Sequence, residues 1–231
     1  MSNGHRNANG HRSANETALF DKMEKELFTA VICDVLDDLG YRNQSMTGQI
    51  RPIQQFASLA GRARTILAAD VYTKPDAPYE MEIEAVDSVA KNEVIVTATN
   101  HSATNAFWGE LLSTYAMLKG ARGAIIDGCS RDIKRISEMG FKLFTAGFNP
   151  LDSKGRCIVI DYNCEINCGG VIVRPNDMVF ADIDGIVVIP REVENEVIER
   201  SLKKVSMENV FLKDLHNGYS LKEAFKRNGI L

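Results

Sequence analysis

The sequence lacks the features that mark several large classes of protein. It contains no apolar run of about 18 residues, the length that spans a bilayer, so we expect no transmembrane helix. Basic residues are not in excess, since 27 Lys and Arg stand against 31 Asp and Glu and the net charge is −4. We therefore expect no membrane partner and no nucleic-acid partner bound through bulk positive charge.

Cysteine is scarce and does not follow a metal-binding or disulfide pattern. The five cysteines are an odd number, and Cys164 and Cys168 have neither a second pair nor a nearby His to complete a zinc site. Residues 1–16 are polar and rich in Asn, without the apolar core of a secretory signal. These observations predict a disordered tail over residues 1–16, free thiols and a cytoplasmic location.

The remaining composition is that of a globular protein, with 45% hydrophobic and 25% charged residues. Apolar residues recur at helical spacing over residues 19–39, where Thr29 could cap a second helix over residues 30–39. Apolar β-type runs then alternate with helical patterns up to residue 150, and β-branched runs follow to residue 189. Residues 191–231 again have a helical pattern.

These patterns predict one α/β domain over residues 17–231. We expect a central βαβ core, a strand-rich second layer, and helical N- and C-terminal regions.

The most informative feature is a glycine that opens a helix. Gly109 precedes the helical pattern, so the unpaired first-turn amides and the helix dipole would face outward as an anion site. Glycine there allows a ligand to approach the backbone closely. Glu110 fits this first turn in two ways, as a functional acid or simply as a residue that the helix dipole favours.

A second loop follows the predicted strand over residues 123–127. Ligands of open α/β sheets bind beyond the carboxyl ends of the strands, so this loop should face the same crevice. Arg131 can hold a carboxylate with two hydrogen bonds, and Asp132 can hold a hard divalent cation. The alternative is that Arg131 only pairs with Asp132 or caps the next helix.

Together these segments resemble a known family. Gly-Glu-Leu-Leu at 109–112, Gly-x-x-Gly at 120–123 and Asp-Gly-x-x-Arg-Asp at 127–132 are similar to motifs of the RraA-like family, which includes class II 4-hydroxy-4-methyl-2-oxoglutarate aldolases. Residues 173–190 resemble its later strand signature, although Asn176 replaces a glycine of the family pattern. The resemblance implies a swivelling β/β/α fold that assembles as a homotrimer or homohexamer.

The resemblance also implies roles for individual residues. Asp132 matches the ligand of a divalent metal, Mg²⁺ or Mn²⁺ or another cation, and Arg131 matches the residue that binds pyruvate and stabilises its enolate. Glu110 matches an acid that orients a water on the metal. Glu208 resembles an acid that the C-terminal helices, about residues 191–231, supply to a neighbouring subunit. The substrate carboxylate is expected at the backbone amides of Gly109, Glu110, Leu111 and Leu112.

The resulting hypothesis is a metal-dependent aldolase that cleaves a 4-hydroxy-2-oxo dicarboxylic acid to pyruvate at a subunit interface, with oxaloacetate decarboxylation as a side activity. One alternative is a non-catalytic regulator of the RNase E inhibitor type, which Asp132 disfavours because such family members tend to lack this acid. Another is the same chemistry on a different keto or sugar acid. A Schiff-base route would need Lys119 or Lys142, and no motif activates either. Trp108 is expected to narrow the pocket.

Overall fold

A mixed nine-stranded sheet organises the computed structural model, which describes the backbone of residues 4–229 and the side chains of residues 15–229. The central strands run parallel in the order β6-β5-β3-β2, and β10 and β11 extend the sheet antiparallel beyond β2. β1 pairs with β6, β4 with β5, and β7 with β2. The bounds are β1 Arg51–Pro52, β2 Leu59–Asp70, β3 Glu93–Ala98, β4 Ala106–Trp108, β5 Gly123–Ser130, β6 Lys142–Phe148, β7 Cys157–Tyr162, β10 Met178–Ala181 and β11 Ile186–Ile189.

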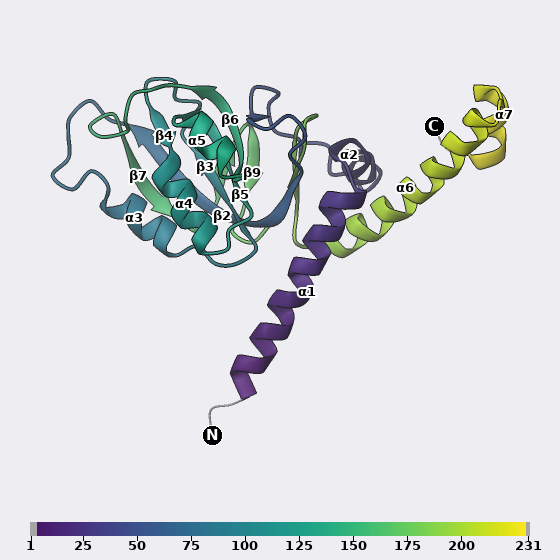
Figure 1. The fold of residues 1–231 in the computed structure, drawn as a ribbon, viewed down its shortest axis with the longest axis horizontal. Coiled ribbons are helices and arrows are strands. Elements are labelled where there is room, and N and C mark those ends of the chain that lie inside the picture. The colour runs from purple at the N-terminus through teal and green to yellow at the C-terminus, as the bar shows by residue number, and fades with distance from the viewer. Residues whose placement is uncertain (1–3, 230–231) are drawn as a thin grey trace.

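Two layers cover the central strands. The helices α3 (Glu80–Asp87), α4 (Glu110–Leu118) and α5 (Ile133–Glu138) lie on one face, as Figure 1 shows. The two-stranded sheet of β8 (Ile166–Cys168) and β9 (Val171–Val173) packs into the apolar cluster on the other face. Every residue of β3 and β5 is therefore buried, as expected for parallel strands covered on both sides. The predicted α/β class with a strand-rich second layer is confirmed.

Helices from both ends of the chain share a third apolar cluster. α2 (Thr29–Asp38) and the first half of α6 (Glu194–His216) pack beside β10 and β11. The second helix begins at Thr29, but Thr29 does not cap it as predicted, because Phe28 holds the N-cap position and the Thr29 amide and hydroxyl donate to Asp182 at 2.8 and 2.7 Å. This contact joins the N-terminal helices to the turn between β10 and β11.

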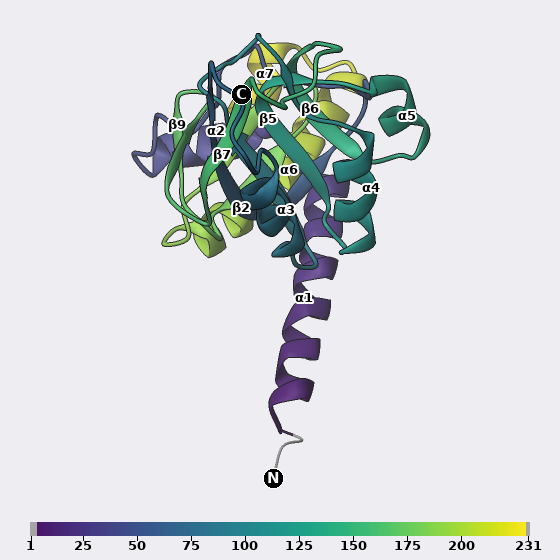
Figure 2. The same cartoon turned by 90° about the vertical axis from the view of Figure 1, so that its left-hand side faces the viewer.

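The N-terminal residues differ from the tail predicted over 1–16. Helix α1 begins at Gly4 and ends at Glu26, while residues 1–3 lie outside the described part. Its C-terminal turns are anchored, since Phe20 and Met23 are fully buried. Once a helix is nucleated, each further residue adds one backbone hydrogen bond, so the helix extends beyond its packed turns. Figures 1 and 2 show this extension leaving the body of the molecule.

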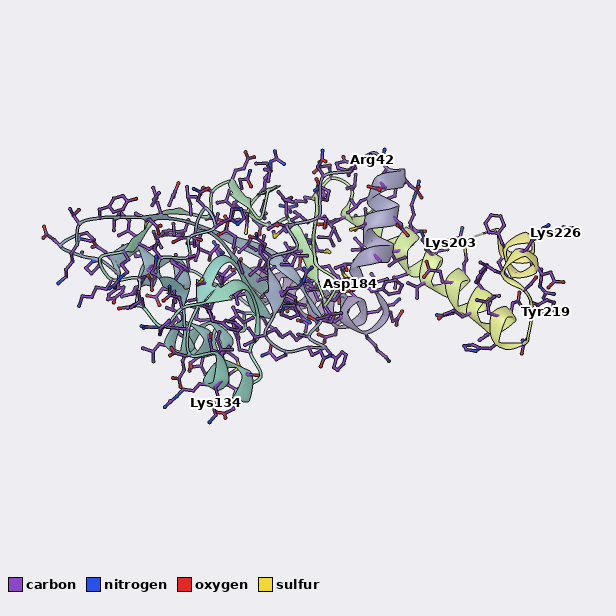
Figure 3. All side chains as sticks on the ribbon, turned by 90° about the horizontal axis from the view of Figure 1, so that it is seen from above. Arg42, Lys134, Asp184, Lys203, Tyr219 and Lys226 are labelled. Carbon is purple, nitrogen blue, oxygen red and sulfur yellow. The ribbon has the colours of Figure 1, made fainter. Side chains whose placement is uncertain are left out.

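The C-terminal region forms an arm. The second half of α6 continues away from the sheet, and α7 (Leu221–Asn228) folds back on it (Figure 1). Arg227 of α7 pairs with Asp214 of α6 at 3.0 Å. Seen from above in Figure 3, Lys226 on this arm lies far from Lys134 on α5. No helix within residues 4–229 combines the length and apolarity that crossing a bilayer requires.

Candidate functional site

A cavity of about 250 Å³ lies where the two predicted loops meet. It opens at the carboxyl ends of β4 and β5, between α3, α4 and the loop after β6. The structure therefore brings together the helix start at Gly109 and the loop that ends in Arg131 and Asp132. The polar residues that line the cavity are Tyr79, Glu82, Glu110, Arg131, Asp132, Asp152 and Ser153.

The two loops touch through Gly109 and Asp132. The Glu110 amide donates to Asp132 Oδ2 at 3.1 Å. A Cβ on Gly109 would lie 2.9 Å from that oxygen and 3.2 Å from Arg131 Cγ, which is closer than side chains normally approach. The close contact, and not a special backbone conformation, is what requires glycine here, since Gly109 is extended with φ −155°.

Asp132 occupies a strained position before α5. Its φ of 59° is left-handed, a region that Asp tolerates better than most residues. Its side chain does not cap α5 and turns instead toward the start of α4. This geometry holds the carboxylate at the mouth of the cavity.

Arg131 lies between two carboxylates. Its Nε is 3.7 Å from Asp132 Oδ2, and its Nη2 is 3.4 Å from Asp152 Oδ1. Arg131 therefore pairs with Asp132, as the alternative held, and its guanidinium also lines the cavity. Two flanking carboxylates fix a guanidinium so that its remaining donors can face a bound anion.

The first turn of α4 offers free donors. The amides of Leu111 and Leu112 have no acceptor among the described residues, while the Glu110 amide is taken by Asp132. The side chain of Leu111 is 79% exposed beside the cavity. Glu110 accepts from Arg135 of α5 at 3.2 Å, so its carboxylate is directed across the space between the two helices.

Sequence reasoning missed three further residues that line the cavity, Tyr79, Glu82 and Asp152. The Tyr79 hydroxyl donates to Asp152, and burial together with this bond raises the pKa of Tyr79 to about 12. Burial is also the main cause that raises the pKa of Glu82 to about 7, with a further contribution from Asp152, while Arg131 opposes it. Asp152 could have been found, because it follows β6, the strand next to β5, and such loops converge.

Other candidates lie elsewhere. Glu208 is on the distal half of α6 and does not line the cavity of its own chain. The expectation that Trp108 narrows the pocket is wrong. Trp108 is fully buried, donates to Ser113 Oγ at 2.8 Å and stacks on Phe141, because its large apolar ring completes the core beneath α4. Asp127 is also buried and holds the Thr99 amide and hydroxyl.

The corner at Asp132 fits a divalent cation that keeps most of its water. Within the described side chains, no group of three or more His, Cys, Asp or Glu could hold a metal, so a cage made only of protein ligands is absent. Asp132 Oδ1 accepts no hydrogen bond from the described residues, which leaves one carboxylate oxygen available. Magnesium commonly binds through one or two carboxylates together with water and substrate oxygens.

Two curated relatives place this geometry in context. A protein of Halalkalibacterium halodurans, provisionally named 4-hydroxy-4-methyl-2-oxoglutarate aldolase, is 30% identical over 176 residues, which cover 76% of this chain and 79% of that protein. Protein DlpA of Legionella pneumophila is 28% identical over 196 residues. This match covers 85% of the chain but 31% of DlpA, so the chain spans about a third of that longer protein.

Solved structures share the fold. An uncharacterized protein of Pseudomonas syringae superposes with a TM-score of 0.82 at 24% identity, covering 91% of this chain and 94% of the other. Streptomyces coelicolor RraAS2, described as an unusual member of the RNase ES inhibitor RraA family, gives 0.75 at 25% identity, with 84% and 94% covered. The sequence profile RraA-like (Aldolase/RraA) matches residues 29–188. The chain therefore belongs to the RraA-like family.

Proposed function

We propose that this protein is a divalent-metal-dependent aldolase that cleaves a 4-hydroxy-2-oxo dicarboxylic acid, such as 4-hydroxy-4-methyl-2-oxoglutarate, and releases pyruvate. The observation that carries the proposal is the convergence of Arg131, Asp132 and the free amides of α4 on one cavity. The names of relatives such as the H. halodurans protein support the same reaction class.

The cavity residues suit the charge that this cleavage creates. The amides of Leu111 and Leu112 bind the substrate carboxylate at the positive end of α4. Arg131 donates to the 2-oxo oxygen, where negative charge grows as the enolate forms, and such a fixed donor is typically worth about 3–4 kcal/mol. A divalent cation at Asp132 would supply Lewis-acid stabilisation of the same charge.

A base must take the proton of the 4-hydroxyl group. Glu110, held by Arg135 at the edge of the cavity, is placed to orient a water for this transfer. When this proton leaves, the C3–C4 bond breaks and its electron pair forms the enolate of pyruvate. Oxaloacetate loses carbon dioxide to give the same enolate, so decarboxylation follows as a side activity.

We further propose that the active protein is a homotrimer or homohexamer with the cavity at a subunit interface. Leu111 is exposed beside the cavity, and the arm of α6 and α7 carries exposed apolar side chains away from its own sheet. A neighbouring arm could bring Glu208 to the cavity. Light scattering on the purified protein measures the mass that decides between one, three and six chains.

The decisive test is pyruvate release from 4-hydroxy-4-methyl-2-oxoglutarate with added Mg²⁺, with Mn²⁺ and after EDTA. Pyruvate should form with either metal, stop with EDTA and resume when metal is restored. Absence of pyruvate under all conditions would overturn the aldolase proposal. Other 4-hydroxy-2-oxo acids and sugar acids, run in parallel, show whether the same cavity prefers another substrate.

The second candidate is a non-catalytic regulator of an RNase. Its support is the structural likeness to RraAS2, described as a member of an RNase inhibitor family. Asp132 and the cavity favour the aldolase over the regulator. Inhibition of RNase E by the purified protein, together with no pyruvate release, would select the regulator.

A further inference from the structure

Glu82 is a buried acid in the cavity that the roles above leave unused. It lies in the first turn of α3, its residue is 8% exposed, and it lines the same cavity as Arg131 and Gly109. No hydrogen bond or ion pair to its carboxyl group occurs among residues 15–229, the side chains that the structure describes. An acid without such partners, buried beside a substrate-sized space, is available to react with what enters that space.

The other acids of the cavity are all engaged. Asp132 accepts the Glu110 amide, Glu110 accepts from Arg135, and Asp152 accepts from Tyr79 while pairing with Arg131. Glu82 differs from them in contacts and in burial.

The charged groups around Glu82 come from several elements. Asp152 of the loop after β6 disfavours its ionisation and Arg131 at the end of β5 favours it. Tyr79 is the residue just before α3, and Cys157 of β7 faces Glu82 with a pKa that burial raises to about 12. Burial is the largest cause, and it raises the pKa of Glu82 to about 7, so much of this acid carries its proton at neutral pH.

We propose that Glu82 is a further catalytic residue, the acid that protonates the enolate carbon after the carbon–carbon bond has broken. The proposal rests on the aldolase function proposed above. It gives the cavity two groups that handle protons, Glu110 at the start of α4 and Glu82 on α3.

The step is balanced in atoms and electrons. The enolate of pyruvate uses its electron pair to form a C–H bond at C3 with the proton of Glu82, and the C2 carbonyl is restored. Glu82 is left as a carboxylate and regains a proton from water before the next turnover. Since the 4-hydroxyl group has lost one proton to the base, the overall reaction neither consumes nor releases protons.

Exchange of the methyl protons of pyruvate with D₂O isolates this step, because it needs proton transfer at C3 but no carbon–carbon cleavage. We would follow it by ¹H NMR with Mg²⁺ for the wild-type chain, Glu82→Gln and the matched control Glu84→Gln. Glu84 is exposed on the same helix and outside the cavity. Cleavage of 4-hydroxy-4-methyl-2-oxoglutarate is measured on the same samples.

We expect E82Q to slow exchange by about 100-fold or more, while E84Q stays within about twofold of wild type. The wild-type exchange rate should show a pH limb near the pKa of Glu82 that E82Q lacks. Exchange by E82Q at the wild-type rate overturns the assignment of Glu82 and leaves the aldolase proposal standing. Wild-type protein that gives neither exchange nor cleavage removes both.

A second variant keeps the test possible if E82Q does not fold, which thermal unfolding would reveal. Glu82→Asp keeps the acid on a side chain one methylene shorter. Misplacement of the acid should lower exchange by about tenfold to a hundredfold and retain the pH limb. Exchange by E82D at the wild-type rate contradicts a direct proton transfer from Glu82.

Discussion

The cavity and the C-terminal arm differ in what holds their side chains in place. At the cavity, close contacts and charges fix each group: a Cβ on Gly109 would lie only 2.9 Å from Asp132 Oδ2, and the Glu110 amide donates to the same oxygen. The arm has few such constraints and leaves apolar side chains 37–55% exposed. These are Met207, Val210, Leu212, Tyr219, Leu221 and Phe225. The contrast teaches that the contacts around the cavity form within one chain, whereas the exposed apolar side chains of the arm suit contact with another surface.

The largest effect should come from removing the positively charged side chain of Arg131 from the cavity. Arg131→Ala is expected to lower kcat for pyruvate release by about 10²–10³-fold, because the growing enolate charge loses its fixed donor. Steady-state kinetics with Mg²⁺ measures it, and Lys134→Ala on exposed α5 is the matched control. Full activity in R131A would break the comparison, since the cavity would then tolerate loss of a residue that its geometry fixes.

The second effect is on stability and depends on pH. The pKa of Glu82 is raised in the folded state, from 4.5 to about 7, so its contribution to stability is present below 4.5 and is lost as pH rises through 7. Wild-type unfolding free energy should therefore fall between pH 5 and pH 8 by about 3 kcal/mol from this group. Urea unfolding of E82Q should lack this decrease, whereas E84Q should retain it. An equal decrease in E82Q would show that other groups cause it.

The third prediction tests whether the close contact of Gly109 with Asp132 and Arg131 is needed for activity. Gly109→Ala should lower kcat by about 100-fold, since the new Cβ displaces Asp132 and Arg131 from their positions. Gly185→Ala is the control, because a Cβ there meets nothing within 4 Å. Thermal unfolding checks that both variants fold. Unchanged kinetics in G109A would mean that the contact can relax without loss of function.

The smallest effect on a single chain should come from the arm. Phe225→Asp replaces an exposed aromatic side chain, so the free energy of unfolding of one chain should change by about 0.5 kcal/mol or less. Light scattering should nevertheless show loss of self-association, because burying the new carboxylate in an apolar contact between chains costs free energy. Lys222→Glu, also exposed on α7, is the control. An unchanged oligomer in F225D would show that the arm does not mediate assembly.

Sequence periodicity predicted the alternating helices and strands of the central sheet and the meeting of its two loops. It succeeded there because buried parallel strands and glycine-ended helices leave strong local patterns. It failed for Trp108, since an aromatic residue next to a helix start has the same local pattern whether it faces a pocket or the core. It missed Glu82 because burial of one acid on a short acidic helix depends on contacts with β7 and the distant Asp152 loop.

The left-handed backbone at Asp132 narrows the choice of residue at the edge of the cavity. Glycine, asparagine and aspartate enter this conformation most readily, and of these only aspartate carries a charge. Exchange of its carboxylate for the amide of asparagine would keep the turn and withdraw the negative group. At this position the backbone conformation and the charge can therefore be separated. Asp132→Asn would give a protein with the same fold that lacks the carboxylate on which the proposed reaction depends.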